Sequence, residues 1–155
     1  GVVLGGIYLA TRAKAAPEGP AAAIKIEVLD AGGNPVQANS PLTLDEGASY
    51  TVAVAVTNTT TKGGLPHEAD LETWVMAAAN WTDLIPGDIF PQHYLPTSIV
   101  YFYSSLVIPL GLGGATGAIT VNVFDPEDNL VATVTKPISI RSMDIVYGAT
   151  VTVGV

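Results

Sequence analysis

A strict alternation of apolar and polar side chains is the feature that most limits what this chain can fold into. In the stretch SYTVAVAVTNTT, residues 49–60, every second side chain from position 50 to position 56 is a large apolar one. The side chains of this apolar face are Tyr50, Val52, Val54 and Val56. The same period of two recurs in IKIEVLD, residues 24–30, whereas helical periodicity is almost absent. The pattern predicts β-strands with one buried face, and residues 49–60 are expected to hold a central strand.

Clusters of Gly, Pro, Asn and Asp separate further strand-like runs along the chain. Residues 69–80 alternate behind a hairpin-like KGGLP, residues 98–110 form a long apolar run, and residues 118–140 read as a hairpin around the turn PEDN. Residues 83–96 are expected to be irregular, because each proline removes a donor from a β-ladder. Seven or eight short strands with turns between them predict an all-β, antiparallel sandwich of immunoglobulin-like or jelly-roll type.

The length and the net charge of the chain limit the size of its domain and the partners that it can bind. A chain of 155 residues is long enough for one domain with a substantial core. Six basic residues against fourteen acidic ones give a net charge of −8, so a phosphate backbone would be repelled and nucleic acid is not an expected partner. The chain has no cysteine, which excludes disulfides and thiolate chemistry without fixing the compartment.

A family resemblance is carried by AGGNPVQANSPLTLDEGASYTVAVAVTNTTTKGG followed by ITVNVFDPEDNLVATV. This pattern of a Gly-marked turn, an alternating strand and a late Asp-turn hairpin resembles the immunoglobulin-like domains common in prokaryotic surface and adhesion proteins. The resemblance covers residues 24–140. It implies a scaffold that lies outside the cytoplasm, and a scaffold alone does not define an activity.

The first fifteen residues, GVVLGGIYLATRAKA, form an apolar arm in front of this domain. The arm admits a signal peptide, the end of a longer membrane anchor, a pilin-like helix, an edge strand of its own sheet, or a strand lent to a neighbour. Three glycines among the first six residues disfavour a helix. The side chains expected to make the contacts are Val2, Val3, Leu4, Ile7, Tyr8 and Leu9. A Pro/Ala/Gly linker, residues 16–23, and the sandwich domain, residues 24–155, complete the expected layout.

Residues that could carry chemistry are few. His67 and His93 lie beside prolines in expected loops and lack metal-ligand spacing. GLGGATG, residues 111–117, departs from a phosphate-binding loop, and DPEDN, residues 125–129, reads as a hairpin turn more readily than as a Ca²⁺ loop. We therefore expect no enzyme activity, no catalytic residue, no metal and no cofactor.

Asparagine and aromatic residues offer two further possibilities. Asn58 and Asn80 begin the sequons NTT and NWT, and Asn58 is the preferred glycosylation candidate if the protein is exported where glycosylation occurs. Five aromatic side chains could instead form a sugar-stacking platform, although such residues are more often core or interface anchors. They are Trp74, Trp81, Tyr94, Tyr101 and Tyr103.

The functional prediction is a non-enzymatic structural subunit of an extracellular, pilus-like filament on a cell surface. Copies of the chain would join head to tail through the apolar arm, and head-to-tail joining does not close on itself. A membrane is a partner only if the N-terminus is the remnant of an anchor. The alternatives are a virion capsid or membrane-attached structural protein, and a carbohydrate-binding surface module.

Overall fold

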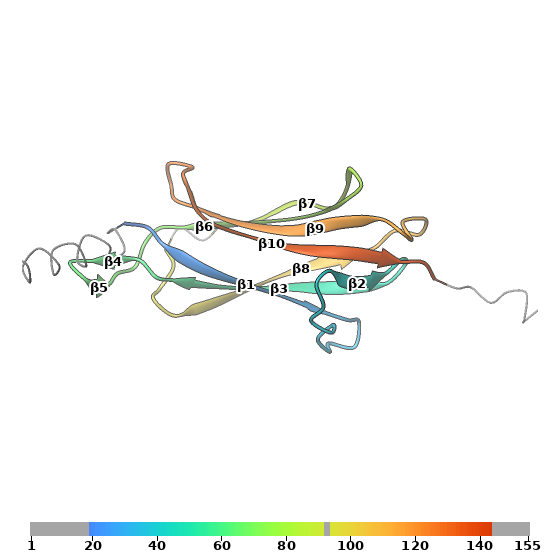
Figure 1. Cartoon of the computed structure of the whole chain (residues 1–155). Coiled ribbons are helices and arrows are strands. Elements are labelled where there is room, and N and C mark those ends of the chain that lie inside the picture. The colour runs from blue at the N-terminus through green and yellow to red at the C-terminus, as the bar shows by residue number, and fades with distance from the viewer. Residues whose placement is uncertain (1–18, 92–93, 144–155) are drawn as a thin grey trace, which may run out of the picture.

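The computed structural model of the chain describes residues 19–91 and 94–143, and these residues form an all-β sandwich (Figure 1). One sheet has three strands in the order β1-β3-β8, and the other has five in the order β2-β10-β9-β6-β7. The first sheet contains β1 (Ala22–Leu29), β3 (Ser49–Asn58) and β8 (Ile99–Val107). The second contains β2 (Leu42–Asp45), β10 (Leu130–Arg141), β9 (Thr116–Phe124), β6 (Glu72–Ala79) and β7 (Thr82–Phe90). A separate small hairpin pairs β4 (Thr61–Lys62) with β5 (Leu65–Pro66).

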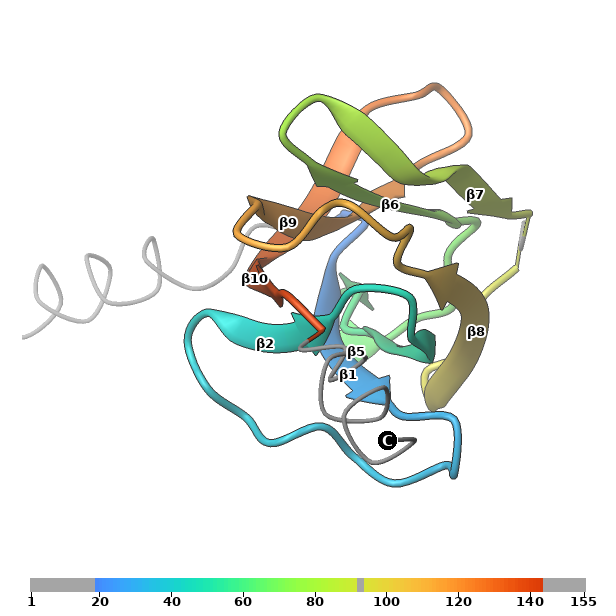
Figure 2. The same ribbon diagram turned by 90° about the vertical axis from the view of Figure 1, so that its right-hand side faces the viewer.

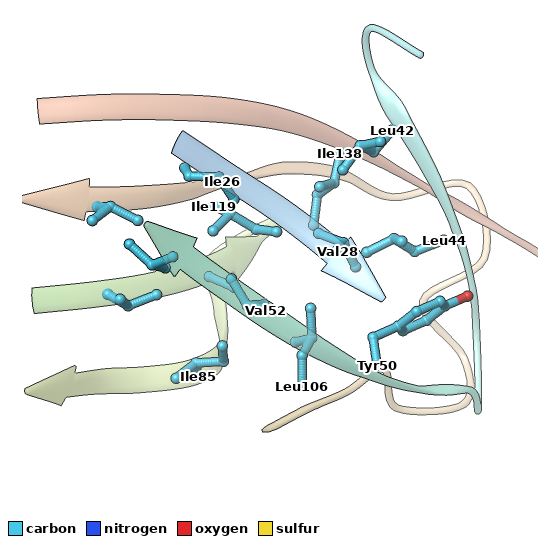
Figure 3. Packing of buried hydrophobic residues seen from close by; sticks show 14 of the residues in the cluster. Ile26, Val28, Leu42, Leu44, Tyr50, Val52, Ile85, Leu106, Ile119 and Ile138 are labelled. Atoms are coloured by element: carbon cyan, nitrogen blue, oxygen red, sulfur yellow. The ribbon is translucent and has the colours of Figure 1, made fainter. Parts of the chain in front are cut away.

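Neighbouring strands are antiparallel except β2, which runs parallel to the end of β10. The two sheets lie face to face, and their inward side chains meet in one apolar core (Figures 2 and 3). Ile26 of β1, Val52 of β3 and Ile119 of β9 are among the side chains packed there. No helix occurs among residues 19–91 and 94–143, and accordingly none in that part of the chain is long and apolar enough to cross a membrane.

The alternation read from the sequence is confirmed in the strands where it was clearest. β3 is the central strand of its sheet and buries the four predicted side chains, from Tyr50 to Val56. β6 likewise buries Thr73, Val75 and Ala77 and turns Trp74 toward the outer side. β9 and β10 form the predicted hairpin. A period of two is enough to decide these faces because one side of each strand meets the core.

The structure differs in two segments from what the sequence pattern led us to expect. β1 begins at Ala22, two residues inside the predicted linker, because alanine carries no polarity signal that would mark a strand end. Residues 82–90 form the strand β7, whereas the sequence predicted an irregular segment from residue 83 onward. Its Pro86 is tolerated because β7 is an edge strand and its pairing with β6 shifts register on either side of Ala77.

A carboxylate ties three segments together at the end of the sandwich where β10 leaves it. Glu46, in the β2–β3 turn, accepts hydrogen bonds from the backbone N–H groups of Gly111 and Gly113 at 2.9 and 3.0 Å, and from Met143 at 3.0 Å. These bonds, the Met143 bond foremost, hold the pKa of Glu46 below its ordinary value. Beside it, the Asp45 carboxylate pairs with the Arg141 guanidinium at 2.7 Å.

Glu46 is expected to make the domain less stable in acid. Because the pKa of Glu46 is lower in the folded chain than the ordinary 4.5, its stabilising effect is fully present above pH 4.5 and disappears as pH falls through the lowered folded pKa. Urea unfolding measured from neutral to strongly acidic pH should show a steeper loss of stability for the natural chain than for Glu46→Gln. Equal pH dependence of the two proteins would contradict this role.

Candidate interaction surfaces

The residues predicted to act in assembly lie outside the described residues. All six of these residues, from Val2 to Leu9, belong to the arm. The function of the arm therefore stays a prediction from the sequence. His93, considered earlier as a metal ligand or base, also lies outside the described residues. The described residues show instead which surfaces a partner could meet.

His67 borders an open polar hollow of about 560 Å³ beside the β4–β5 hairpin. Lys62, Glu68, Asp70 and Tyr94 also line it. The Tyr94 hydroxyl is hydrogen-bonded to Glu68, and this bond is the main reason why the pKa of Tyr94 is raised. The hollow therefore offers scattered charges of both signs and does not define a nucleophile with its base.

The two sequon asparagines differ in exposure. Asn58 is 4% exposed; its amide nitrogen donates to the Leu95 carbonyl at 2.8 Å, and its amide oxygen accepts from the Thr60 N–H at 3.0 Å. A glycan on Asn58 would have to break this buried arrangement. Asn80, by contrast, is exposed in the β6–β7 turn. Neither site is tested by this geometry, and glycosylation stays a prediction.

The Asp125 carboxylate stabilises the turn formed by residues 125–129. One oxygen of the Asp125 carboxylate accepts from the N–H groups of Glu127 and Asn129 at 3.0 and 2.8 Å, and the other accepts from the Asn129 amide at 3.0 Å. The bonds with Asn129 are the main cause of the lowered pKa of Asp125. Asp128 adopts a left-handed backbone conformation, with φ of 62°. This is an Asx-type turn that closes the β9–β10 hairpin.

The five aromatic residues considered as a platform lie on separate parts of the molecule. Trp74 is on the outer side of the five-stranded sheet, and Tyr101 and Tyr103 are on the outer side of the three-stranded sheet. Trp81 projects from the β6–β7 turn and is fully exposed, and Tyr94 lies by the polar hollow. A single sugar-stacking platform made from all five is therefore excluded by the strand order.

All the exposed large apolar side chains of the three-stranded sheet lie in the outer row of β8. Ile99, Tyr101, Tyr103 and Val107 alternate along the strand and are 52–59% exposed. Four exposed apolar or aromatic side chains in one row on one strand exceed the scattered apolar residues normal for a surface. Such a row indicates an interaction surface.

β8 is also a sheet edge without the usual protection. Among the described residues it pairs with β3 on one side only. Its nine residues, IVYFYSSLV, contain no charge and no proline, and their pairing with β3 runs without a register shift. Natural edge strands are usually kept from pairing with other chains by charges, prolines, bulges or short length.

The other three edges have such protection. β2 has four residues, β1 carries Lys25 and Glu27, and β7 carries Pro86, two aspartates and a bulged pairing. β7 meets β8 only through side chains: the rings of Phe90 and Phe102 lie 5.0 Å apart, and the Ser104 hydroxyl donates to Asp88. Both β8 residues point to the inner side, so the outward row is left exposed.

A shallow trough runs beside the exposed row. Ala53 and Ala55 of β3 lie opposite Tyr103 and Tyr101 of β8, so small side chains are flanked by large ones. The trough has a volume of about 280 Å³ and is closed on its far side by Lys25 and Glu27 of β1. The edge, the row and the trough together form what we term the β8 surface. Tyr101 and Tyr103 were among the aromatic residues considered from the sequence, but only the strand order makes β8 an edge.

Comparison with known proteins gives a likeness of fold alone. No family model matches the chain, and no curated protein matches it. The solution structure of a CARDB domain from Pyrococcus furiosus is similar, with a TM-score of 0.51 and 15% sequence identity over 81% of this chain and 98% of that one. The all-β sandwich is thus an arrangement that a solved immunoglobulin-like domain also has.

Two further solved structures are more distantly similar. A Niemann-Pick type C2 protein from the Japanese carpenter ant aligns over 82% of this chain and 96% of that one, with 9% identity and a TM-score of 0.48. A crystal structure of the P. furiosus CARDB domain in complex with di-metal ions aligns over 78% and 88%, with 15% identity and a TM-score of 0.41. Their ligands and functions are properties of those proteins.

Proposed function

We propose that this chain is a non-enzymatic structural subunit that polymerises on a cell surface or outside the cell into a pilus-like filament. In this proposal the apolar arm of one copy adds as a fourth strand to the β8 edge of the next copy. The observation that carries the proposal is the unprotected β8 edge with its exposed apolar row. The extracellular location rests on the resemblance of the sequence pattern to surface and adhesion domains.

Length and chemistry of the two segments match. β8 has nine residues and would span about 30 Å, and the first ten residues of the arm would span about 33 Å when extended. An added strand would gain main-chain hydrogen bonds along β8, and its side chains would pack beside Ile99, Tyr101 and Tyr103. The arm is apolar on both faces, so it can cover the row on one side while its other side chains are buried between subunits.

Carbohydrate binding is a second candidate, supported by one specific observation. Tyr101 and Tyr103 stand two residues apart on the same side of β8 and are 58% and 59% exposed, a spacing that lets two rings stack on successive sugars of a glycan. We favour assembly because Ile99 and Val107 extend the row with side chains that offer no ring for stacking. In this second candidate a soluble glycan would bind the monomer, and Tyr101→Ala would abolish that binding.

The proposal is tested by removing the donor strand. The full chain and a version that lacks residues 1–16 should be compared by negative-stain electron microscopy and by sedimentation at several protein concentrations. Filaments in the full chain alone would support the proposal. Monomers in both preparations, or filaments in both, would contradict donation by the arm.

A further inference from the structure

A second surface lies on the opposite side of the molecule, over β6, β7 and β9. Strand register brings its side chains together: Glu72 of β6 is paired with Phe124 of β9, and Trp74 of β6 is paired with Ile89 of β7. Directly paired residues point to the same side of a sheet, so these four share the outer face. Together with Asp128 they line a hollow of about 350 Å³, which we term the Trp74 hollow.

Asp128 reaches this hollow from the β9–β10 turn. The turn rises from the sheet on its outer side at one end of the sandwich (Figure 1). Its left-handed conformation at Asp128, with φ of 62°, is part of the turn that Asp125 closes. A carboxylate is thereby placed at the border of a hollow whose walls are otherwise mostly apolar.

The indole of Trp74 packs closely against Gly87 of β7. A Cβ atom on Gly87 would lie 2.7 Å from the Trp74 indole nitrogen and 3.1 Å from two ring carbons. The indole therefore lies against the bare backbone of Gly87, which has φ of 60°. Gly87 permits both the backbone conformation and the close approach, and any larger residue would push the ring away. Gly87 thus leaves room for the Trp74 ring at the wall of the hollow.

Asp128 contributes a carboxylate to the hollow, and no basic side chain is among the five lining residues. The basic residues of the described part lie elsewhere: Arg141 pairs with Asp45, Lys136 approaches the Ile26 carbonyl, Lys25 lies on the other sheet, and Lys62 lines the polar hollow. Aromatic faces beside carboxylates attract cations that are weakly hydrated.

We propose that the Trp74 hollow binds a quaternary ammonium group, with the cation against the rings of Trp74 and Phe124 and its charge balanced by Asp128. The apolar walls favour an alkylated cation over a strongly hydrated ammonium such as that of lysine. The hollow lies on the five-stranded sheet, so this binding is independent of assembly through the β8 surface.

Intrinsic fluorescence can report this site directly. The chain has two tryptophans, so in the full chain carrying Trp81→Phe all indole fluorescence comes from Trp74. Choline is the probe, and 3,3-dimethylbutan-1-ol, which has the same shape without the charge, is its control. We expect choline to change Trp74 emission saturably and the neutral alcohol to bind at least about fivefold more weakly.

Charge removal gives the second half of the test. Asp128→Asn in the Trp81→Phe chain should weaken choline binding about fivefold, whereas Glu27→Gln removes a carboxylate from the other sheet and should leave it unchanged. Equal binding of choline and the neutral alcohol, equal weakening by Glu27→Gln, or no saturable response would each overturn the proposal. Saturable binding of a neutral glycan in place of choline would do so as well.

Discussion

Two variants that cannot polymerise alone should form a single one-to-one complex when they are mixed. Leu4→Asp with Ile7→Asp disables the arm as a donor, since two charges would have to be buried between subunits. Tyr101→Lys with Tyr103→Lys disables the acceptor, because lysines on an edge strand oppose pairing with another chain. The first variant keeps its β8 edge and the second keeps its arm, so one strand can be donated once and growth then stops.

The complex should be measured by sedimentation and light scattering, with electron microscopy to confirm that filaments are missing. Tyr101 and Tyr103 are more than half exposed, so the lysines should leave the domain folded. The matched control is Thr133→Lys with Thr135→Lys, which places the same charges at the same spacing on β10, an interior strand of the other sheet. This control should still form filaments. Polymerisation of either disabled variant alone would show that its segment is not the donor or the acceptor.

Secondary structure was predictable where one face of a strand meets the core. The period of two in residues 49–60 fixed which side chains of β3 are buried, because a shift by one residue would expose Val52, Val54 and Val56 together. β7 was missed because its pattern is weak: Pro86 and Gly87 interrupt it, and an edge strand need not alternate cleanly. The length of β1 was missed because two alanines fit a linker and a strand equally well.

The surfaces were less predictable than the strands, since both depend on contacts between distant parts of the chain. Nothing local in IVYFYSSLV reveals that β8 lies at an edge; this follows from the order β1-β3-β8. The Trp74 hollow joins residues from 72 to 128, and their meeting is decided by the registers of β6 with β7 and of β6 with β9. A sequence shows which residues alternate, but not which strands become neighbours.

Gly117→Val is expected to destabilise the domain strongly, by about 3 kcal/mol or more. Gly117 is the last glycine of GLGGATG and lies between Ala79 of β6 and Ile138 of β10. A Cβ atom here would collide with the Ala78 carbonyl oxygen and lie 2.6 Å from the Ala79 Cα. Both partners are backbone atoms, so no side chain can turn aside, and β6 would have to move away from β9. The glycine-rich run thus has a structural requirement at its end, which is close packing of strands.

Urea unfolding should measure this loss, with Ala118→Val as the matched control. Ala118 is the next residue of β9 and already carries a Cβ atom between Ala78 and Pro137, so added bulk there points to the half-exposed outer side. We expect the control to change the free energy of unfolding by less than about 1 kcal/mol, because substitutions at partly exposed strand positions are usually mild. If Gly117→Val were as stable as Ala118→Val, β6 and β9 could separate at little cost. The register that builds the Trp74 hollow would then be only loosely fixed, since that same pairing sets Glu72 opposite Phe124 and Trp74 opposite Asn122.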